Sequence, residues 1–87
     1  MSDVVLYTTR WCPYCIRALR LLDSKGVAYT TIDVGENPAL RAEMMARAGR
    51  NTVPQIWIGD THVGGCDELY ALERAGRLDA MLKGQEQ

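Results

Sequence analysis

The sequence predicts an α/β fold, in which helices flank a four-stranded mixed sheet in the order βαβ, helix, ββ, helix. Near the start, a β-prone run, a helical run and a second β-prone run fit within about 30 residues, which is typical of a right-handed βαβ unit. Farther along, two short β-prone runs separated by Gly59-Asp60 indicate a hairpin. At 87 residues, there is room for one modest core. We therefore expect residues 1–87 to form a single domain, with a frayed polar tail at about 84–87.

The first strand is predicted at Val4–Tyr7, an apolar run that suits a strand buried on both faces in a parallel pair. A helix should follow, because Pro13 is tolerated in a first helical turn and Lys25-Gly26 is a stop signal. Its apolar positions recur at helical spacing and are expected to face the core: Ile16, Leu19 and Leu22.

The second strand is predicted over 27–34, where side chains alternate between two faces. Asn37 is the expected N-cap of a second helix and Pro38 its first residue. The apolar face of this helix should contain Leu40, Met44, Met45 and Ala48, and Gly49 should end it.

The hairpin strands are predicted at Gln55–Ile58 and Thr61–Val63, with His62 on the strand surface. A third helix should open at Cys66, because acidic residues follow there as the helix dipole prefers. Its buried face should contain Leu69, Leu72 and Ala75. Beyond Gly76, a last helical turn should contain Leu78, Met81 and Leu82. Both tryptophans, Trp11 and Trp57, are expected to pack.

Composition and charge argue against several classes of protein. The formal net charge is −1, and the basic residues are scattered, so neither nucleic acid nor a membrane is an expected partner. The first residues lack the pattern of a signal peptide, and no apolar run approaches the roughly 20 residues of a membrane span. Three cysteines are too few for a disulfide framework. We therefore expect a cytoplasmic protein in which a close cysteine pair is catalytic or metal-binding.

The pair Cys12 and Cys15 lies at the junction between the first strand and the first helix. Unpaired N–H groups and the positive end of the helix dipole stabilise a thiolate at such a junction. Residues three apart share one side of a helix, so the two sulfurs can approach closely enough for a disulfide. We expect Cys12 to have the lowered pKa and to attack, and Cys15 to resolve the mixed disulfide. Arg10 could add positive charge beside them.

The cysteine pair admits two other interpretations. The cysteines could simply pack in the core, since free cysteine is often buried. Alternatively, Cys12, Cys15, His62 and Cys66 could form a zinc site with three cysteines and one histidine. The spacing of the second pair does not fit a zinc knuckle, and Pro13 stiffens the first loop. We therefore expect no metal.

Three motifs together resemble the glutaredoxins. Cys12-Pro13-Tyr14-Cys15 is similar to their dithiol motif, Thr52-Val53-Pro54 to their cis-proline loop, and Gly64-Gly65-Cys66-Asp67 to the start of their glutathione-binding helix. The motifs occur in the same order and spacing, and the resemblance covers nearly the whole chain. It is closest to the short bacterial dithiol glutaredoxins of the glutaredoxin 3 type.

The resemblance implies a single glutaredoxin domain with the minimal thioredoxin fold and a cis peptide bond between Val53 and Pro54. It implies a glutathione-dependent oxidoreductase that reduces protein disulfides and glutathionylated thiols. Glutathione would be the reducing cosubstrate, with no bound cofactor, and the protein would act as a monomer. Its protein targets could include ribonucleotide reductase. The implied glutathione contacts are Tyr14, Thr52, Val53, Pro54, Gly65, Cys66 and Asp67.

One position departs from the family pattern. Family members commonly have a lysine after the first strand, where this chain has Thr9, with Arg10 next. Arg10 could replace the missing cation, and Arg41 and Arg50 are other candidates. Two rival functions also stay open. One is a thioredoxin-like donor served by a flavoprotein reductase. The other is an iron–sulfur carrier that uses Cys12 and glutathione as ligands.

Overall fold

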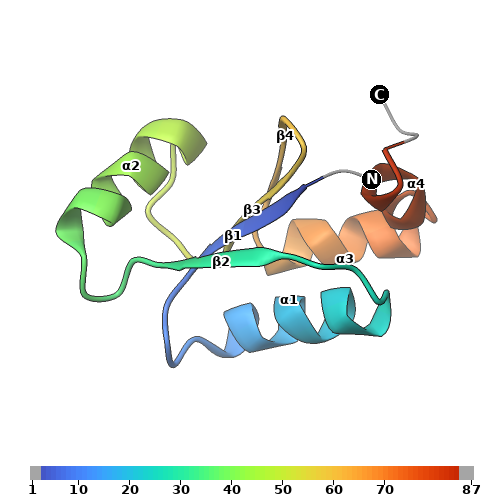
Figure 1. Cartoon of the computed structure of the whole chain (residues 1–87), viewed down its shortest axis with the longest axis horizontal. Helices are drawn as coiled ribbons and strands as arrows, with labels where there is room; N and C mark the ends of the chain where they lie inside the picture. The colour runs from blue at the N-terminus through green and yellow to red at the C-terminus, as the bar shows by residue number, and fades with distance from the viewer. Residues whose placement is uncertain (1–2, 85–87) are drawn as a thin grey trace.

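The computed structural model describes residues 3–84, so the predicted frayed tail lies outside the described residues except for Gly84. The eight elements follow the predicted order: β1 (Val4–Thr8), α1 (Pro13–Ser24), β2 (Thr30–Asp33), α2 (Pro38–Ala48), β3 (Gln55–Ile58), β4 (Thr61–Gly64), α3 (Cys66–Arg74) and α4 (Leu78–Leu82). Figure 1 shows the helices around a twisted sheet. The predicted four-stranded mixed sheet is confirmed, with strand order β2-β1-β3-β4.

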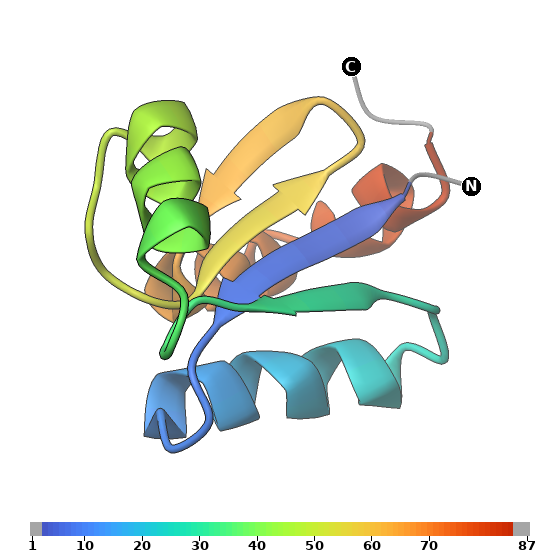
Figure 2. The same ribbon diagram turned by 60° about the vertical axis from the view of Figure 1, so that its left-hand side comes forward.

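The pairing of β1 decides where the functional loops lie. This strand runs parallel to β2 and antiparallel to β3, and Tyr7 near its carboxyl end pairs with Gln55 at the start of β3. The loop after β1 and the loop before β3 therefore leave the sheet at the same end (Figure 2). Segments about 40 residues apart in the sequence are brought together in this way, as the hydrogen bond between Cys12 and Val53 shows.

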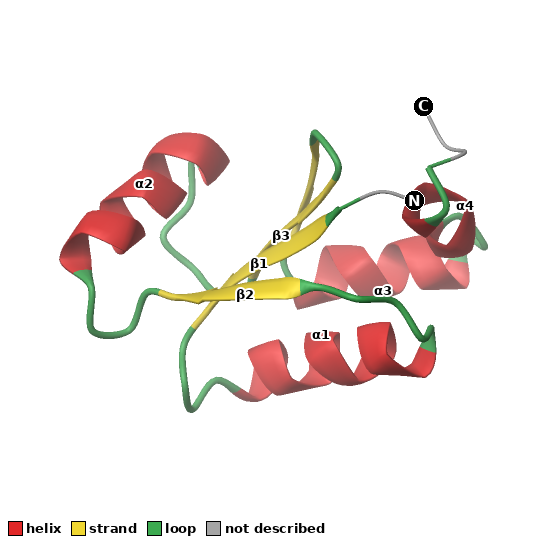
Figure 3. Ribbon diagram, viewed as in Figure 1, coloured by secondary structure: helices red, strands yellow, loops and turns green. Residues whose placement is uncertain are grey.

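Helices cover both faces of the sheet (Figure 3). On one face, α1, α3 and α4 enclose the larger core, which includes Leu6, Leu22, Ile56, Leu69 and Leu78. On the other face, α2 covers a smaller core of Tyr7, Val34, Met44 and Trp57. Within residues 3–84, every helix falls short of the length and apolar character that a membrane crossing requires.

The helix ends agree with the sequence signals. Cys12 and Asn37 are the N-caps of α1 and α2, and each is followed by a proline. The Asn37 side chain accepts a hydrogen bond from the backbone N–H of Leu40 at 3.1 Å. Gly49 ends α2 in the left-handed conformation, with φ of 71°, where glycine is favoured.

The predicted apolar faces were partly wrong. Ile16 is 44% exposed, because the buried stripe of α1 begins one residue earlier, at Cys15, and continues through Ala18 to Leu22. Met45 is also 44% exposed, because α2 presents Met44 to the sheet. Ala75 is the exposed C-cap of α3 and not part of its buried face.

Two further expectations need correction. The second strand spans only Thr30–Asp33, because it forms an edge that pairs with β1 alone over this length. Trp11 does not pack: it is 85% exposed in the loop after β1, whereas Trp57 is buried as expected.

Candidate active site

Cys12 is placed at the start of α1 by the strand-to-helix junction. Its backbone is extended, with φ of −94° and ψ of 113°, and its sulfur accepts the backbone N–H of Cys15 at 3.3 Å. The Cys12 thiol also donates to the carbonyl oxygen of Val53 at 3.7 Å. The side chain is only half-buried, so an incoming disulfide can reach a sulfur that a helix N–H already contacts.

Cys15 lies one turn into the helix and is only 2% exposed. Burial, together with the neighbouring Cys12 sulfur, raises the pKa of Cys15 from its ordinary 9.0 to about 12. Cys15 is therefore a protonated thiol at neutral pH. The two cysteines differ in access as predicted, with the partly open one at the helix end and the buried one behind it.

The loop before β3 forms the opposite wall of the site. Its Val53–Pro54 peptide bond is cis, as the resemblance implied. Pro54 is buried and Val53 half-buried, and the carbonyl oxygen of Val53 is the group that faces the Cys12 sulfur.

A groove of about 330 Å³ extends from this loop to the start of α3. Each of the seven residues for which the resemblance implied a glutathione contact lines this groove: Tyr14, Thr52, Val53, Pro54, Gly65, Cys66 and Asp67. Arg50 and Glu68 complete the lining. The structure thus brings together three motifs that are spread over more than half of the sequence.

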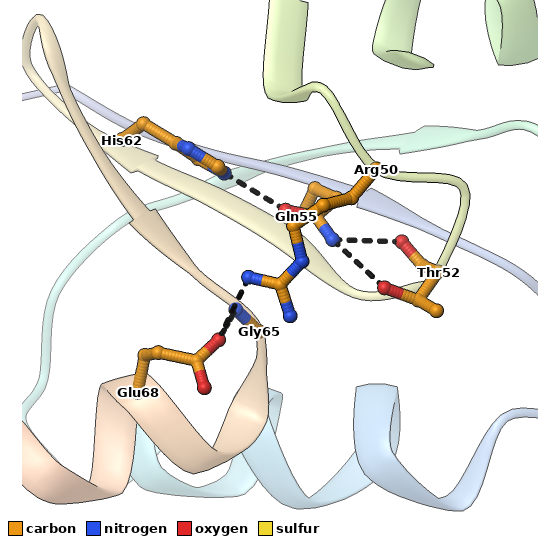
Figure 4. Close-up of polar contacts among 6 residues, drawn as sticks. All are labelled: Arg50, Thr52, Gln55, His62, Gly65 and Glu68. Atoms are coloured by element: carbon orange, nitrogen blue, oxygen red, sulfur yellow. Dashed lines mark hydrogen bonds and ion pairs between the residues drawn. The ribbon is translucent and has the colours of Figure 1, made fainter.

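Arg50 and Glu68 form a polar cluster in the groove that includes the N-cap of α3 (Figure 4). The Glu68 carboxylate accepts the backbone N–H of Gly65 at 2.7 Å and pairs with the Arg50 guanidinium at 3.1 Å. The Gly65 N–H, with help from Arg50, lowers the pKa of Glu68. The sequence did not single out Glu68 as a site residue, although a glutamate three residues after an N-cap can accept the N-cap N–H; with glycine as the N-cap, this is the half of a capping box that can form. Arg50 was only one of several candidate cations.

Arg10 lies outside the groove between the Val53–Pro54 loop and α3. It lines a second cavity of about 400 Å³, together with Thr9, Trp11, Asp33, Gly35 and Glu36. Arg41 donates instead to Asn51 at 2.8 and 2.9 Å. Of the cations in the described part of the chain, Arg50 is the one that lines the groove, so the charge expected from Arg10 comes from a different segment.

A zinc site would require His62 to lie beside the cysteines, but its side chain contacts Gln55 instead. Its ring is half-buried, and Nε2 lies 2.8 Å from Oε1 of Gln55. Among residues 3–84, no three His, Cys, Asp or Glu side chains are arranged to hold a metal ion. Cys66 is 4% exposed at the groove wall, and burial raises its pKa.

Comparison with known proteins agrees with this geometry. Residues 4–63 match the family model for glutaredoxin. The chain is 65% identical to a glutaredoxin of Pseudomonas aeruginosa, covering 94% of this chain and 98% of that one. It is 53% identical to glutaredoxin 3 of Escherichia coli K12, covering 95% and 100%.

Solved structures are similar over nearly the whole chain. The solution structure of a Brucella melitensis glutaredoxin has a TM-score of 0.88 at 56% identity, covering 100% of this chain and 95% of that one. A crystal structure of a buckwheat glutaredoxin–glutathione complex has a TM-score of 0.89 at 33% identity, covering 97% and 79%. These likenesses confirm the predicted minimal thioredoxin fold. Family model, relatives and site geometry agree, and the chain belongs to the glutaredoxin family of thiol–disulfide oxidoreductases.

Proposed function

We propose that this glutaredoxin uses glutathione to reduce protein disulfides and glutathionylated thiols through Cys12 and Cys15. One observation carries the proposal: the seven residues implied as glutathione contacts line a single groove, and Val53 in that groove contacts the Cys12 sulfur. A tripeptide bound there would have its sulfur at the nucleophile.

The chemistry of the groove suits glutathione, which has two carboxylates and one ammonium group at neutral pH. The start of α3 offers N–H groups to a carboxylate, and Arg50 offers a guanidinium. The Asp67 carboxylate can face the ammonium group, and the backbone of Val53 can pair with the peptide. The buckwheat complex, whose fold is similar along most of this chain, supports the same ligand.

With a glutathionylated protein, the Cys12 thiolate attacks the glutathione sulfur, and the protein leaves as a thiolate that takes up a proton. The thiolate of a second glutathione then attacks the glutathione sulfur bound to Cys12. This step releases oxidised glutathione and regenerates the Cys12 thiolate. The cycle needs one cysteine and consumes one free glutathione, because the other half of the oxidised glutathione comes from the substrate.

With a protein disulfide, Cys12 attacks one sulfur and forms a mixed disulfide with the protein. Cys15 then attacks the Cys12 sulfur, and its proton goes to the departing protein thiolate. The resulting Cys12–Cys15 disulfide is reduced by two glutathione molecules. In the mixed disulfide Cys12 no longer has a thiol, so one of the causes that raise the Cys15 pKa is removed at the step that needs its thiolate.

Two cysteine variants test the assignment of roles. We expect C12S to lose turnover with both substrates. In contrast, C15S should keep the reduction of a small glutathione mixed disulfide and lose the reduction of a protein disulfide. Both can be assayed with glutathione, NADPH and glutathione reductase. Activity in C12S would contradict the mechanism. Faster reduction of the oxidised protein by thioredoxin reductase than by glutathione would favour the thioredoxin-like alternative.

We propose further that the protein works as a monomer in the cytoplasm. The resemblance to the short glutaredoxins favours a monomer, and the cysteine content suits a reducing compartment. Light scattering of the reduced protein measures the first point, and a dimer at micromolar concentration would contradict it. Immunoblotting of cell fractions measures the second.

A further inference from the structure

A chain of hydrogen bonds runs from β4 to the loop that faces Cys12. His62 Nε2 lies 2.8 Å from Gln55 Oε1, and Gln55 Nε2 donates to the carbonyl and hydroxyl oxygens of Thr52 at 3.0 and 3.1 Å (Figure 4). Thr52 lines the groove, and Val53 follows it. We propose that His62 and Gln55 are positioning residues that hold the Thr52–Pro54 segment in place for substrate binding. This inference rests on the proposed function.

The direction of each bond follows from the chemistry of the groups. The Thr52 carbonyl can only accept, so the Gln55 amide nitrogen must face it and the Gln55 oxygen must face His62. That oxygen is also only an acceptor, and therefore His62 Nε2 has to carry a proton. Burial, with help from the charge of Arg50, lowers the pKa of His62. The ring is thus neutral at pH 7.5, with Nδ1 unprotonated.

Packing holds the first two members of this chain of bonds, His62 and Gln55, in place. The His62 ring stacks on Trp57 with 4.6 Å between ring centroids and 27° between planes. Trp57 is its partner in the β3–β4 pairing and is 6% exposed. Gln55 is fully buried. A buried amide costs free energy unless it is hydrogen-bonded, so Gln55 favours the loop conformation in which Thr52 accepts from it.

The position of Thr52 should affect the reacting Cys12 sulfur through Val53, the next residue along the loop. The Val53 carbonyl contacts the Cys12 thiol, and Val53 and Pro54 line the groove. Neither His62 nor Gln55 lines the groove. Their loss should therefore weaken substrate binding more than it slows the chemical step.

The first test is spectroscopic and does not depend on activity. The ¹⁵N resonances of the imidazole ring at pH 7.5 report which nitrogen carries the proton. We expect the Nε2–H tautomer in the parent protein, and in Q55L a shift of the Nε2 resonance, because the acceptor of that N–H is lost. An Nδ1–H tautomer in the parent protein would overturn the proposal, whatever the substrate is.

The second test is kinetic. H62F keeps an aromatic ring against Trp57 but removes the donor, whereas H62Q restores an N–H donor. Loss of one neutral hydrogen bond corresponds to a factor of about five. We expect H62F to raise KM for a glutathionylated peptide about fivefold with kcat within twofold, and H62Q to return KM to within twofold of the parent value.

The matched control is Y7F, which removes a buried hydroxyl from the hydrogen bonds with Glu43 and Arg47, outside the groove. It should leave KM unchanged. An unchanged KM in H62F, or an equal rise in H62F and Y7F, would overturn the positioning role. If the parent protein failed to turn over glutathionylated peptide at all, the proposed function would fail, and the tautomer measurement would still decide the hydrogen-bond chain.

Discussion

Alkylation of the native, reduced protein at pH 8 should stop after one of the three cysteines. The thiolate is the reactive form of cysteine. Burial raises the Cys15 pKa from its ordinary 9.0 to about 12, so its thiolate fraction at pH 8 falls from about one in ten to about one in ten thousand. Cys15 should therefore react with iodoacetamide about a thousandfold more slowly than an ordinary exposed cysteine. Cys66 is also buried with a raised pKa, which leaves Cys12 to be labelled.

The assay is timed labelling with iodoacetamide, followed by digestion and mass spectrometry of each cysteine peptide. In the C12S variant, the Cys15 peptide reports on Cys15 without competition from Cys12. It keeps burial, the largest cause of the raised pKa, and loses the smaller contribution of the Cys12 sulfur. Labelling in denaturant is the control, where all cysteines should react at similar rates. A Cys15 rate in native C12S within tenfold of that of a small free thiol would refute the reasoning.

Two further predictions concern the cluster at the start of α3. R50M should raise KM for a glutathionylated peptide about fivefold, because a charge-assisted hydrogen bond is lost in an open groove. The control R20M removes the same charge from the exposed surface of α1 and should leave KM unchanged. Equal effects of the two substitutions would contradict the role of Arg50. The Gly65 N–H holds the folded pKa of Glu68 below its ordinary 4.5, so its stabilisation is complete above about pH 4.5 and is lost as pH falls through the lower folded value. Urea unfolding between pH 3 and 7 should show a shallower loss of stability in E68Q than in the parent, and parallel curves would contradict this.

Local sequence signals predicted the order of elements and the cysteine pair. A strand, a turn and a helix occur within residues 4–24, and their signals are short-range: an apolar run, a proline and helical spacing. The same signals wrongly predicted that Ile16 lies on the buried face of α1. The actual stripe of α1 is formed by Cys15 and Ala18 together with Leu22. Cysteine and alanine contribute little to a hydrophobic pattern, so the rotation of the helix could not be read from the sequence.

The polar contacts that support the groove could not be predicted from local sequence signals for another reason. Gln55 and His62 lie on two paired strands, and Trp57, which shares a face with Gln55, is the residue opposite His62. Alternation therefore places both side chains on one face of the hairpin but does not predict the hydrogen bond between them. In the sequence, Arg50 does not differ from other cations in loops, and only the fold places it opposite Glu68. Resemblance to the glutaredoxins located the groove, but the supporting contacts needed three-dimensional information.

The antiparallel pairing of β1 with β3 has a consequence for how activity arises during folding. The first half of the chain, through α2, contains both Cys12 and Cys15 but none of the groove wall from Thr52 onward. That wall lies opposite Cys12 only when Tyr7 pairs with Gln55, and a contact between residues so far apart in the sequence costs more loop-closure entropy than a local one. We therefore expect a newly made chain to have both thiols before it has the groove that selects a substrate.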